Sequence, residues 1–125
     1  MADDVNKGPY DTEVVSDAVS ALFDKVGQGI LVTHSQGGGP GWMTAIKNSK
    51  VRAVVAYDPD SGFVFPEGEV PASMPNSPGT LVPLGISLSD FMQLTKIPII
   101  IYYGDNIPDQ VSANVDMLLS YTYLI

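Results

Sequence analysis

Residues 33–37, Thr-His-Ser-Gln-Gly, combine residue types that could carry out nucleophilic chemistry. They follow a short run of aliphatic and β-branched residues, so the serine is expected on a turn between a strand and a helix. Such a turn requires small residues two positions before and after the serine, and Thr33 and Gly37 occupy these positions. The backbone N–H of Gln36 is then placed to stabilise an oxyanion at the start of the helix. The pattern predicts Ser35 as a nucleophile.

Other glycine-rich turns between a strand and a helix bind phosphate, and this segment departs from both common patterns. A dinucleotide-binding turn needs glycine directly after the strand, where this chain has Thr33, His34 and Ser35. A P-loop needs Gly-Lys followed by Ser or Thr, which the sequence does not contain. The arrangement of strand, turn and helix therefore favours the nucleophile turn.

The elements that must position this serine alternate between helix and strand. Apolar spacing predicts an amphipathic helix over 12–26 with Asp11 as its N-cap, and short apolar runs bounded by glycine predict strands buried on both faces. In chain order the expected elements are a helix at 12–26, a strand at 30–33, a helix at 42–47, a strand at 51–57, a short helix at 88–94 capped by Ser87 or Ser89, and a strand at 97–103. Pro40 fits only if it lies in the first turn of the second helix. This order predicts an α/β fold, a parallel sheet flanked by helices.

The remaining segments divide the chain into a single partial domain over 1–125. Residues 1–10 are expected to form a loose leader, and 59–86 a long loop or cap segment rich in proline and glycine. Residues 111–125 form an atypical tail that ends in an uncharged apolar run of high β-propensity. Three strands make a thin sheet, and its exposed apolar edges would favour self-association.

Composition excludes several classes of function. The formal net charge of −8 disfavours nucleic acid as a partner, and the lack of cysteine removes disulfides and thiolate ligands. The acidic residues follow no recognised metal-ligand spacing, so no metal or other cofactor is expected. No secretory signal or membrane-spanning run is visible, so we expect a soluble, by default cytoplasmic, protein.

The segment 33–38, Thr-His-Ser-Gln-Gly-Gly, resembles the nucleophile elbow of α/β-hydrolase-fold serine esterases and lipases. Residues 51–59 resemble the next strand of that family with its acidic end, and 96–105 resemble the strand after it with a Gly-Asp ending. The resemblance covers roughly residues 12–110 and corresponds to the C-terminal part of the family's core. Thr33 together with Asp58-Pro59 looks closest to a bacterial esterase subfamily.

The resemblance implies roles for a second and a third catalytic residue. The family order is serine, then acid, then histidine, and both Asp58 and Asp105 end a strand after the elbow. Asp58 is preferred because of the match at Asp58-Pro59, Asp105 stays as the alternative, and Asp60 is a weaker third choice. Asp58 and Asp105 could instead be turn residues.

The resemblance also implies a catalytic histidine downstream of these residues, and this chain has only His34. Neighbouring strand residues point to opposite faces, so His34 cannot activate Ser35. We therefore expect hydrolysis of a small-molecule carboxylic ester, through an acyl-enzyme intermediate, in the complete parent protein. The alternative is a catalytically inactive, truncated or degenerate hydrolase fragment.

Two aromatic groups near these residues have open roles. Trp42 and Met43 are expected in the core rather than in contact with a ligand. Residues 63–65, Phe-Val-Phe, follow the preferred acid, and they could line an acyl pocket or anchor an ordinary loop. The sequence names no specific substrate-binding residue.

Overall fold

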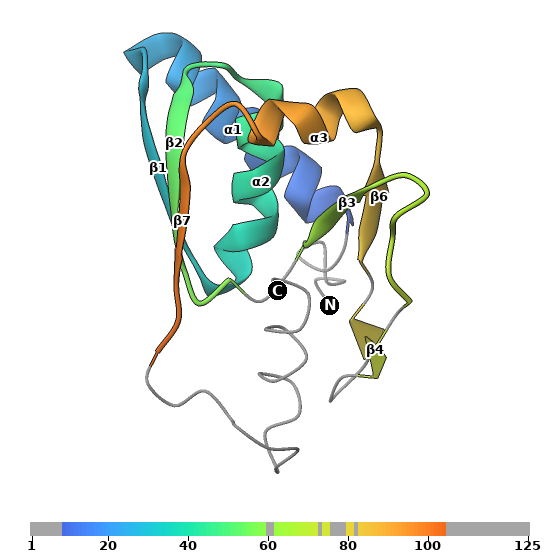
Figure 1. Ribbon diagram of the computed structural model, residues 1–125. Helices are drawn as coiled ribbons and strands as arrows, with labels where there is room; N and C mark the ends of the chain where they lie inside the picture. The colour runs from blue at the N-terminus through green and yellow to red at the C-terminus, as the bar shows by residue number, and fades with distance from the viewer. Residues whose placement is uncertain (1–8, 60–61, 73, 76–79, 82, 105–125) are drawn as a thin grey trace, which may run out of the picture.

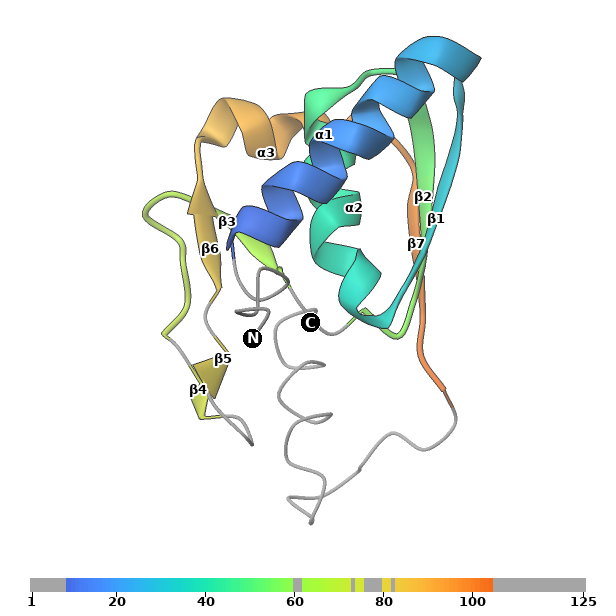
Figure 2. The same cartoon turned by 180° about the vertical axis from the view of Figure 1, so that it is seen from behind.

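A three-stranded parallel sheet forms one layer of the molecule, and helices form the second layer on one of its faces (Figures 1 and 2). The computed structural model describes residues 9–59, 62–72, 74–75, 80–81 and 83–104. The sheet has the order β1 (Gly29–His34), β2 (Val51–Tyr57) and β7 (Ile99–Tyr102). The predicted class, an α/β fold with a parallel sheet flanked by helices, is confirmed.

The helices are longer at their N-terminal ends than the sequence pattern predicts. α1 spans Pro9–Val26, so Asp11 lies inside the helix and its predicted role as N-cap is wrong. α2 spans Gly38–Lys47 instead of beginning at Trp42, which puts Pro40 in its first turn, where proline is tolerated. α3 spans Leu88–Leu94 as predicted, and the Ser87 hydroxyl accepts a hydrogen bond from the Asp90 N–H.

Short strands interrupt the long segment between β2 and α3. β3 (Val64–Pro66) pairs in parallel with β6 (Leu84–Ile86), and β4 (Met74–Pro75) pairs antiparallel with β5 (Thr80–Leu81). β3 and β6 lie beyond α3 from the main sheet (Figure 1). The expectation of mostly irregular structure therefore holds only in part.

The strands of the main sheet are buried on one face only, which corrects the expectation of burial on both faces. Along β1 the half-buried residues alternate with exposed ones, and Ile30 and Val32 keep 63% and 62% of their surface exposed. The exposed row continues across the sheet to Tyr57 and Tyr102, whose rings stack at 5.3 Å. An apolar strand run therefore identified the strand but could not reveal whether a second layer covers it.

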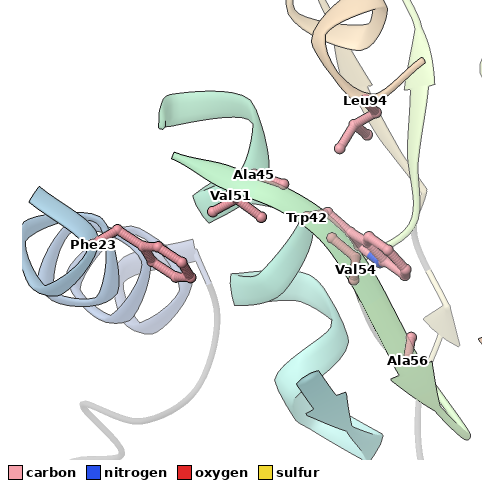
Figure 3. Packing of buried hydrophobic residues seen from close by; sticks show 7 residues of the cluster. All are labelled: Phe23, Trp42, Ala45, Val51, Val54, Ala56 and Leu94. Atoms are coloured by element: carbon pink, nitrogen blue, oxygen red, sulfur yellow. The ribbon is translucent and has the colours of Figure 1, made fainter. Parts of the chain in front are cut away.

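The core lies between the sheet and the three helices. Trp42 of α2 is 5% exposed and packs between strand β2 and helix α3, as Figure 3 shows. The other members of this buried cluster are Phe23, Ala45, Val51, Val54, Ala56 and Leu94. The expectation that Trp42 is a core residue is confirmed.

Polar groups fasten α1 to α2. The Lys47 ammonium donates to Glu13, Asp17 and the Ser16 hydroxyl at 2.7–2.8 Å. The buried Asn48 side chain donates to the Ser20 carbonyl at 2.9 Å. A buried amide with satisfied hydrogen bonds is stabilising and directional, so these bonds fix how α1 lies across α2.

The apolar stripe of α1 faces away from α2. This stripe includes Val14, Leu22 and Val26, which are spaced eight and four residues apart. All three are among the exposed large hydrophobic residues. The buried side of α1 instead carries Ser16 and Phe23. The predicted amphipathic helix therefore forms, but it leaves these three apolar residues exposed while Phe23 packs in the core and Ser16 bonds to Lys47. Within the described residues, no helix is both long and apolar enough to cross a bilayer.

We predict that Asn48→Ala lowers the free energy of unfolding by about 2 kcal/mol, because it removes several hydrogen bonds of a buried amide to Ser20, Asp24 and Lys50. Urea denaturation followed by circular dichroism measures this change. Lys96→Ala is the matched control, since Lys96 is exposed and bonds only locally, to Gln93. A loss for Asn48→Ala no larger than that of the control would contradict the assigned role.

The carboxylate of Asp24 makes the stability of the attachment of α1 depend on pH. Hydrogen bonds from Lys50 and Asn48, together with the charge of Lys50, lower the pKa of Asp24 below its ordinary value of 3.8. A carboxylate with a lowered folded pKa stabilises the protein above the unfolded value, and this contribution is lost as the pH falls through the folded value.

We therefore expect the wild-type chain to be more stable than Asp24→Asn at neutral pH, with the difference vanishing as the pH falls below 3.8. Urea denaturation of both chains over a pH series measures it. A difference that stays constant across this range would show that the charge of Asp24 does not contribute.

Candidate functional site

Ser35 occupies a strained turn between a strand and a helix. His34 ends β1 in an extended conformation, and Ser35 then has φ 53° as the first residue of the 3₁₀ helix η1 (Ser35–Gly37), which leads directly into α2. The left-handed region is uncommon for residues other than glycine. Such backbone strain persists where surrounding contacts enforce it, and it concentrates at functional sites.

A close contact between β1 and α2 enforces this turn. A Cβ atom at Gly41 would lie 2.5 Å from Cγ2 of Thr33, so only glycine allows the helix to approach the strand this closely. A Cβ atom at Gly37 would lie 3.9 Å from Thr33, which is ordinary van der Waals contact. A methyl group therefore fits at Gly37, and the close contact between the strand and the helix lies at Gly41.

A second close approach brings the segment after β2 to the first turn of α2. A Cβ atom at Gly62 would lie 2.4 Å from the Cα of Gly39, and Gly62 itself has φ 66°. Phe63 follows directly and is buried. The predicted aromatic segment at 63–65 therefore begins beside the helix that carries the serine turn.

Asp58 lies at the end of β2, next to the turn of Ser35. His34 of β1 is the register partner of Tyr57 of β2. Ser35 directly follows His34, and Asp58 directly follows Tyr57, so the two residues occupy equivalent positions at the ends of neighbouring strands. Asp58 also has a positive φ, 44°. Neighbouring strands lie about 4.8 Å apart, so the structure brings these two residues together at the carboxyl edge of the sheet.

The carboxylate of Asp58 is anchored to the end of β7. Its Oδ1 accepts a hydrogen bond from the Gly104 N–H at 2.9 Å, and its own N–H donates to the Tyr102 carbonyl at 2.8 Å. These bonds hold the acid at the edge of the sheet where sites in open α/β folds lie. The other acid candidates, Asp60 and Asp105, lie outside the described residues.

His34 points to the face of the sheet that carries no helices. It belongs to the exposed set along β1, whereas Thr33 faces Gly41 on the helix side. The alternation of strand residues therefore directs the imidazole away from the layer that holds α2. Gln36 is the second residue of η1, at the N-terminal end of a helical segment, the end that attracts negative charge.

An apolar cavity of about 330 Å³ lies between the main sheet and the outer strands. Its walls come from α2, α3, β7 and the segment around β3. The residues that line it are Trp42, Phe63, Val64, Phe65, Phe91, Leu94, Thr95, Ile99 and Ile101. Residues 63–65 contribute three of these lining residues.

The sequence pattern did not predict the roles of Gly39, Gly41 and the Gly104 N–H in positioning Ser35 and Asp58. The signal for Gly39 and Gly41 was present, because glycine is disfavoured inside a helix and a helix that contains several must gain from close packing. The bond from the Gly104 N–H to Asp58 joins residues 46 positions apart, and no local pattern encodes it.

No protein-family model and no curated protein matches this chain.

We predict that Gly41→Ala destabilises the protein by about 1–3 kcal/mol and disturbs the turn of Ser35, because the added methyl group meets Thr33. Gly37→Ala, on the same helical segment, is the matched control and should be tolerated. Adding Thr33→Ala to Gly41→Ala should recover much of the loss, because the clashing methyl group is removed. Thermal denaturation of the four chains measures these differences, and equal effects at 37 and 41 would contradict the contact.

Proposed function

We propose that the chain belongs to the α/β-hydrolase lineage and is the part of a carboxylic-ester hydrolase that carries the nucleophile. The observation that supports this most directly is the left-handed conformation of Ser35 on a turn between a strand and a helix. A nucleophilic serine of this class needs that geometry so that its Oγ stands clear of the sheet. The anchored Asp58 on the neighbouring strand adds the second element of the site.

The proposed reaction is acyl transfer to serine. The Oγ of Ser35 attacks the ester carbonyl carbon, and the negative charge that develops on the carbonyl oxygen is stabilised by the N–H of Gln36 at the helix N-terminus. The hydroxyl proton passes to a histidine, which returns it to the leaving alcohol. Asp58 orients that imidazole, and its bond from Gly104 keeps the carboxylate at the edge of the sheet. Water then cleaves the acyl-enzyme.

The histidine of this reaction has to come from outside these 125 residues, because the only histidine, His34, faces the opposite side of the sheet. This observation also favours a second candidate, a non-catalytic relative that binds esters without turning them over. Loss of one member of a serine triad leaves roughly 10³–10⁴-fold catalysis over water, which comes from the oxyanion hole and substrate binding and does not depend on the serine.

A fluorophosphonate probe tests the proposed nucleophile. We predict slow covalent labelling of the full chain at Ser35, detected by mass spectrometry of the intact protein and of its peptides. Labelling should vanish in Ser35→Ala and persist in Ser89→Ala, a matched control at an exposed serine of α3. Labelling of Ser35→Ala equal to that of the unmodified chain would refute the assignment of Ser35 as the nucleophile.

Turnover of p-nitrophenyl acetate separates the two candidates. Hydrolysis above the Ser35→Ala background supports the hydrolase. Labelling of Ser35 with no turnover above that background, both for the chain alone and with added imidazole as a substitute base, supports the non-catalytic relative.

A further inference from the structure

The face of the main sheet that carries no helices, here called the far face, exposes large apolar side chains (Figures 1 and 2). The register of the strands aligns these side chains in rows that cross the sheet, such as the row of His34, Tyr57 and Tyr102. A row of this kind makes neighbouring side chains into one surface. The large apolar members of the far face are Ile30, Val32, Tyr57, Ile100 and Tyr102, which are 44–63% exposed.

The far face has the composition of a protein–protein interface. Among the described residues, the acidic ones belong to α1, to α3, to the segment after β3 and, at Asp58, to the end of β2. The centre of the far face therefore carries no acidic residue, although the chain has a net charge of −8. The centres of interfaces are depleted of Lys, Glu and Asp and enriched in aromatic residues and arginine. Two tyrosines and one arginine give the far face this character.

Arg52 joins the far face at the start of β2, where the register with β1 shifts. Val51 and Val54 are both 1% exposed and belong to the core cluster. The two residues between them therefore face away from the core, and Arg52 is exposed. The far face thus carries a cation at its amino-terminal end and the stacked rings of Tyr57 and Tyr102 at its carboxyl end.

This polarity is complementary to a second copy of the same face. When two far faces pack with their strands antiparallel, β2 of one copy lies over β2 of the other in the opposite direction. Arg52 of each copy then lies over the end that carries the stacked tyrosines and Asp58, where rings and carboxylate both attract a guanidinium. Parallel strands would instead place Arg52 against Arg52, and like charges repel. The charge pattern therefore favours a two-fold arrangement with antiparallel strands.

The area of the far face is sufficient for a weak dimer. A tyrosine side chain buries about 150–250 Å² when enclosed, and an aliphatic one buries less. The five large side chains are about half exposed, so together they present on the order of 450 Å². Two such faces, with the exposed Arg52 and His34, would bury roughly 1,100 Å², and a specific interface needs about 1,000 Å². A reversible dimer with a micromolar dissociation constant is therefore expected.

We propose that the far face binds a second copy of this chain in a two-fold, face-to-face dimer with antiparallel strands. Two-fold symmetry occupies both faces, so assembly ends at two copies. Association through the edges of the sheet, which the sequence suggested, would instead add further copies without limit. The dimer does not depend on the chemistry proposed for Ser35.

The first measurement is sedimentation equilibrium of the full chain over a concentration series that extends well above the micromolar range. We expect one reversible equilibrium between monomer and dimer. A chain that stays monomeric throughout, or that forms species larger than the dimer, would overturn the proposal.

Substitution of Val32 by lysine locates the interface. Val32 is 62% exposed on the far face, and Val14, the matched control, is 66% exposed on α1, so a lysine at either position is solvated in the monomer. Both substitutions make the chain less acidic and therefore reduce the general repulsion between copies equally. We expect Val32→Lys to weaken dimerisation at least about tenfold and Val14→Lys not to weaken it. Equal weakening by the two variants would overturn the location.

A second variant separates loss of the interface from loss of the fold. Val32→Thr keeps a β-branched side chain of similar shape, so it should preserve the strand and the thermal stability of the monomer while weakening the dimer severalfold. Circular dichroism monitors the fold of each variant. A Val32→Thr chain that dimerises as strongly as the unmodified chain would contradict burial of Val32 in the interface.

Cross-linking tests the direction of the strands. The chain contains no cysteine, so Arg52→Cys and Tyr57→Cys each provide one thiol at a known position. In an equal mixture of the two chains treated with a short bismaleimide, we expect more links between positions 52 and 57 than links between identical positions, identified by mass spectrometry. Adding Val32→Lys to both chains should abolish the links. A majority of links between identical positions would overturn the antiparallel arrangement.

Discussion

The close packing of α2 against the end of β1 is the constraint on which the rest of the site depends. Gly41 rests on the Thr33 methyl group at a distance that no other residue permits, and Gly39 touches Gly62 in the same way. These contacts keep α2 close to the end of β1, so the helical segment begins directly after the strand. Ser35 lies between the strand and this helix and takes the left-handed conformation. The strain at the serine is therefore maintained by glycine contacts on the opposite side of the turn.

The same helix organises both chemical features of the molecule. Its first turn follows Ser35, and its middle contributes Trp42 to the core and to the wall of the apolar cavity. Its C-terminal end, at Lys47 and Asn48, carries the hydrogen bonds to α1. A displacement of α2 would therefore change the serine turn, the cavity and the helix packing together. This coupling explains why a methyl group at Gly41 is expected to act at a distance.

The distribution of apolar surface sets this fold apart from an ordinary two-layer domain. The outer stripe of α1 and the far face of the sheet both expose large hydrophobic side chains within the described residues, whereas Phe23 of α1 packs in the core and Lys47 and Asn48 bond to α1. Amphipathic elements usually bury their apolar side. Directional hydrogen bonds from Lys47 and Asn48, together with the buried ring of Phe23, therefore fix the position of α1.

The local sequence was sufficient for the existence and type of the main elements and for the position of Ser35. Alternation of helix and strand patterns predicted the parallel sheet, because strand and helix differ in the period of their apolar residues. It also placed Asp58 at a strand end. Local patterns failed at the start of α2, since a run of glycines has low helix propensity and only packing makes it helical.

Tertiary structure alone decided which surfaces are buried and which distant groups meet. Apolar periodicity in α1 and β1 is the same whether or not another layer covers the residues, so it could not foretell their exposure. The bond from the Gly104 N–H to Asp58, the contact of Gly62 with Gly39 and the cavity below them join segments that are remote in the chain. Such contacts depend on how elements are placed in space. The sequence by itself thus determined the turn at Ser35 and the elements beside it, because these follow from spacing over a few residues.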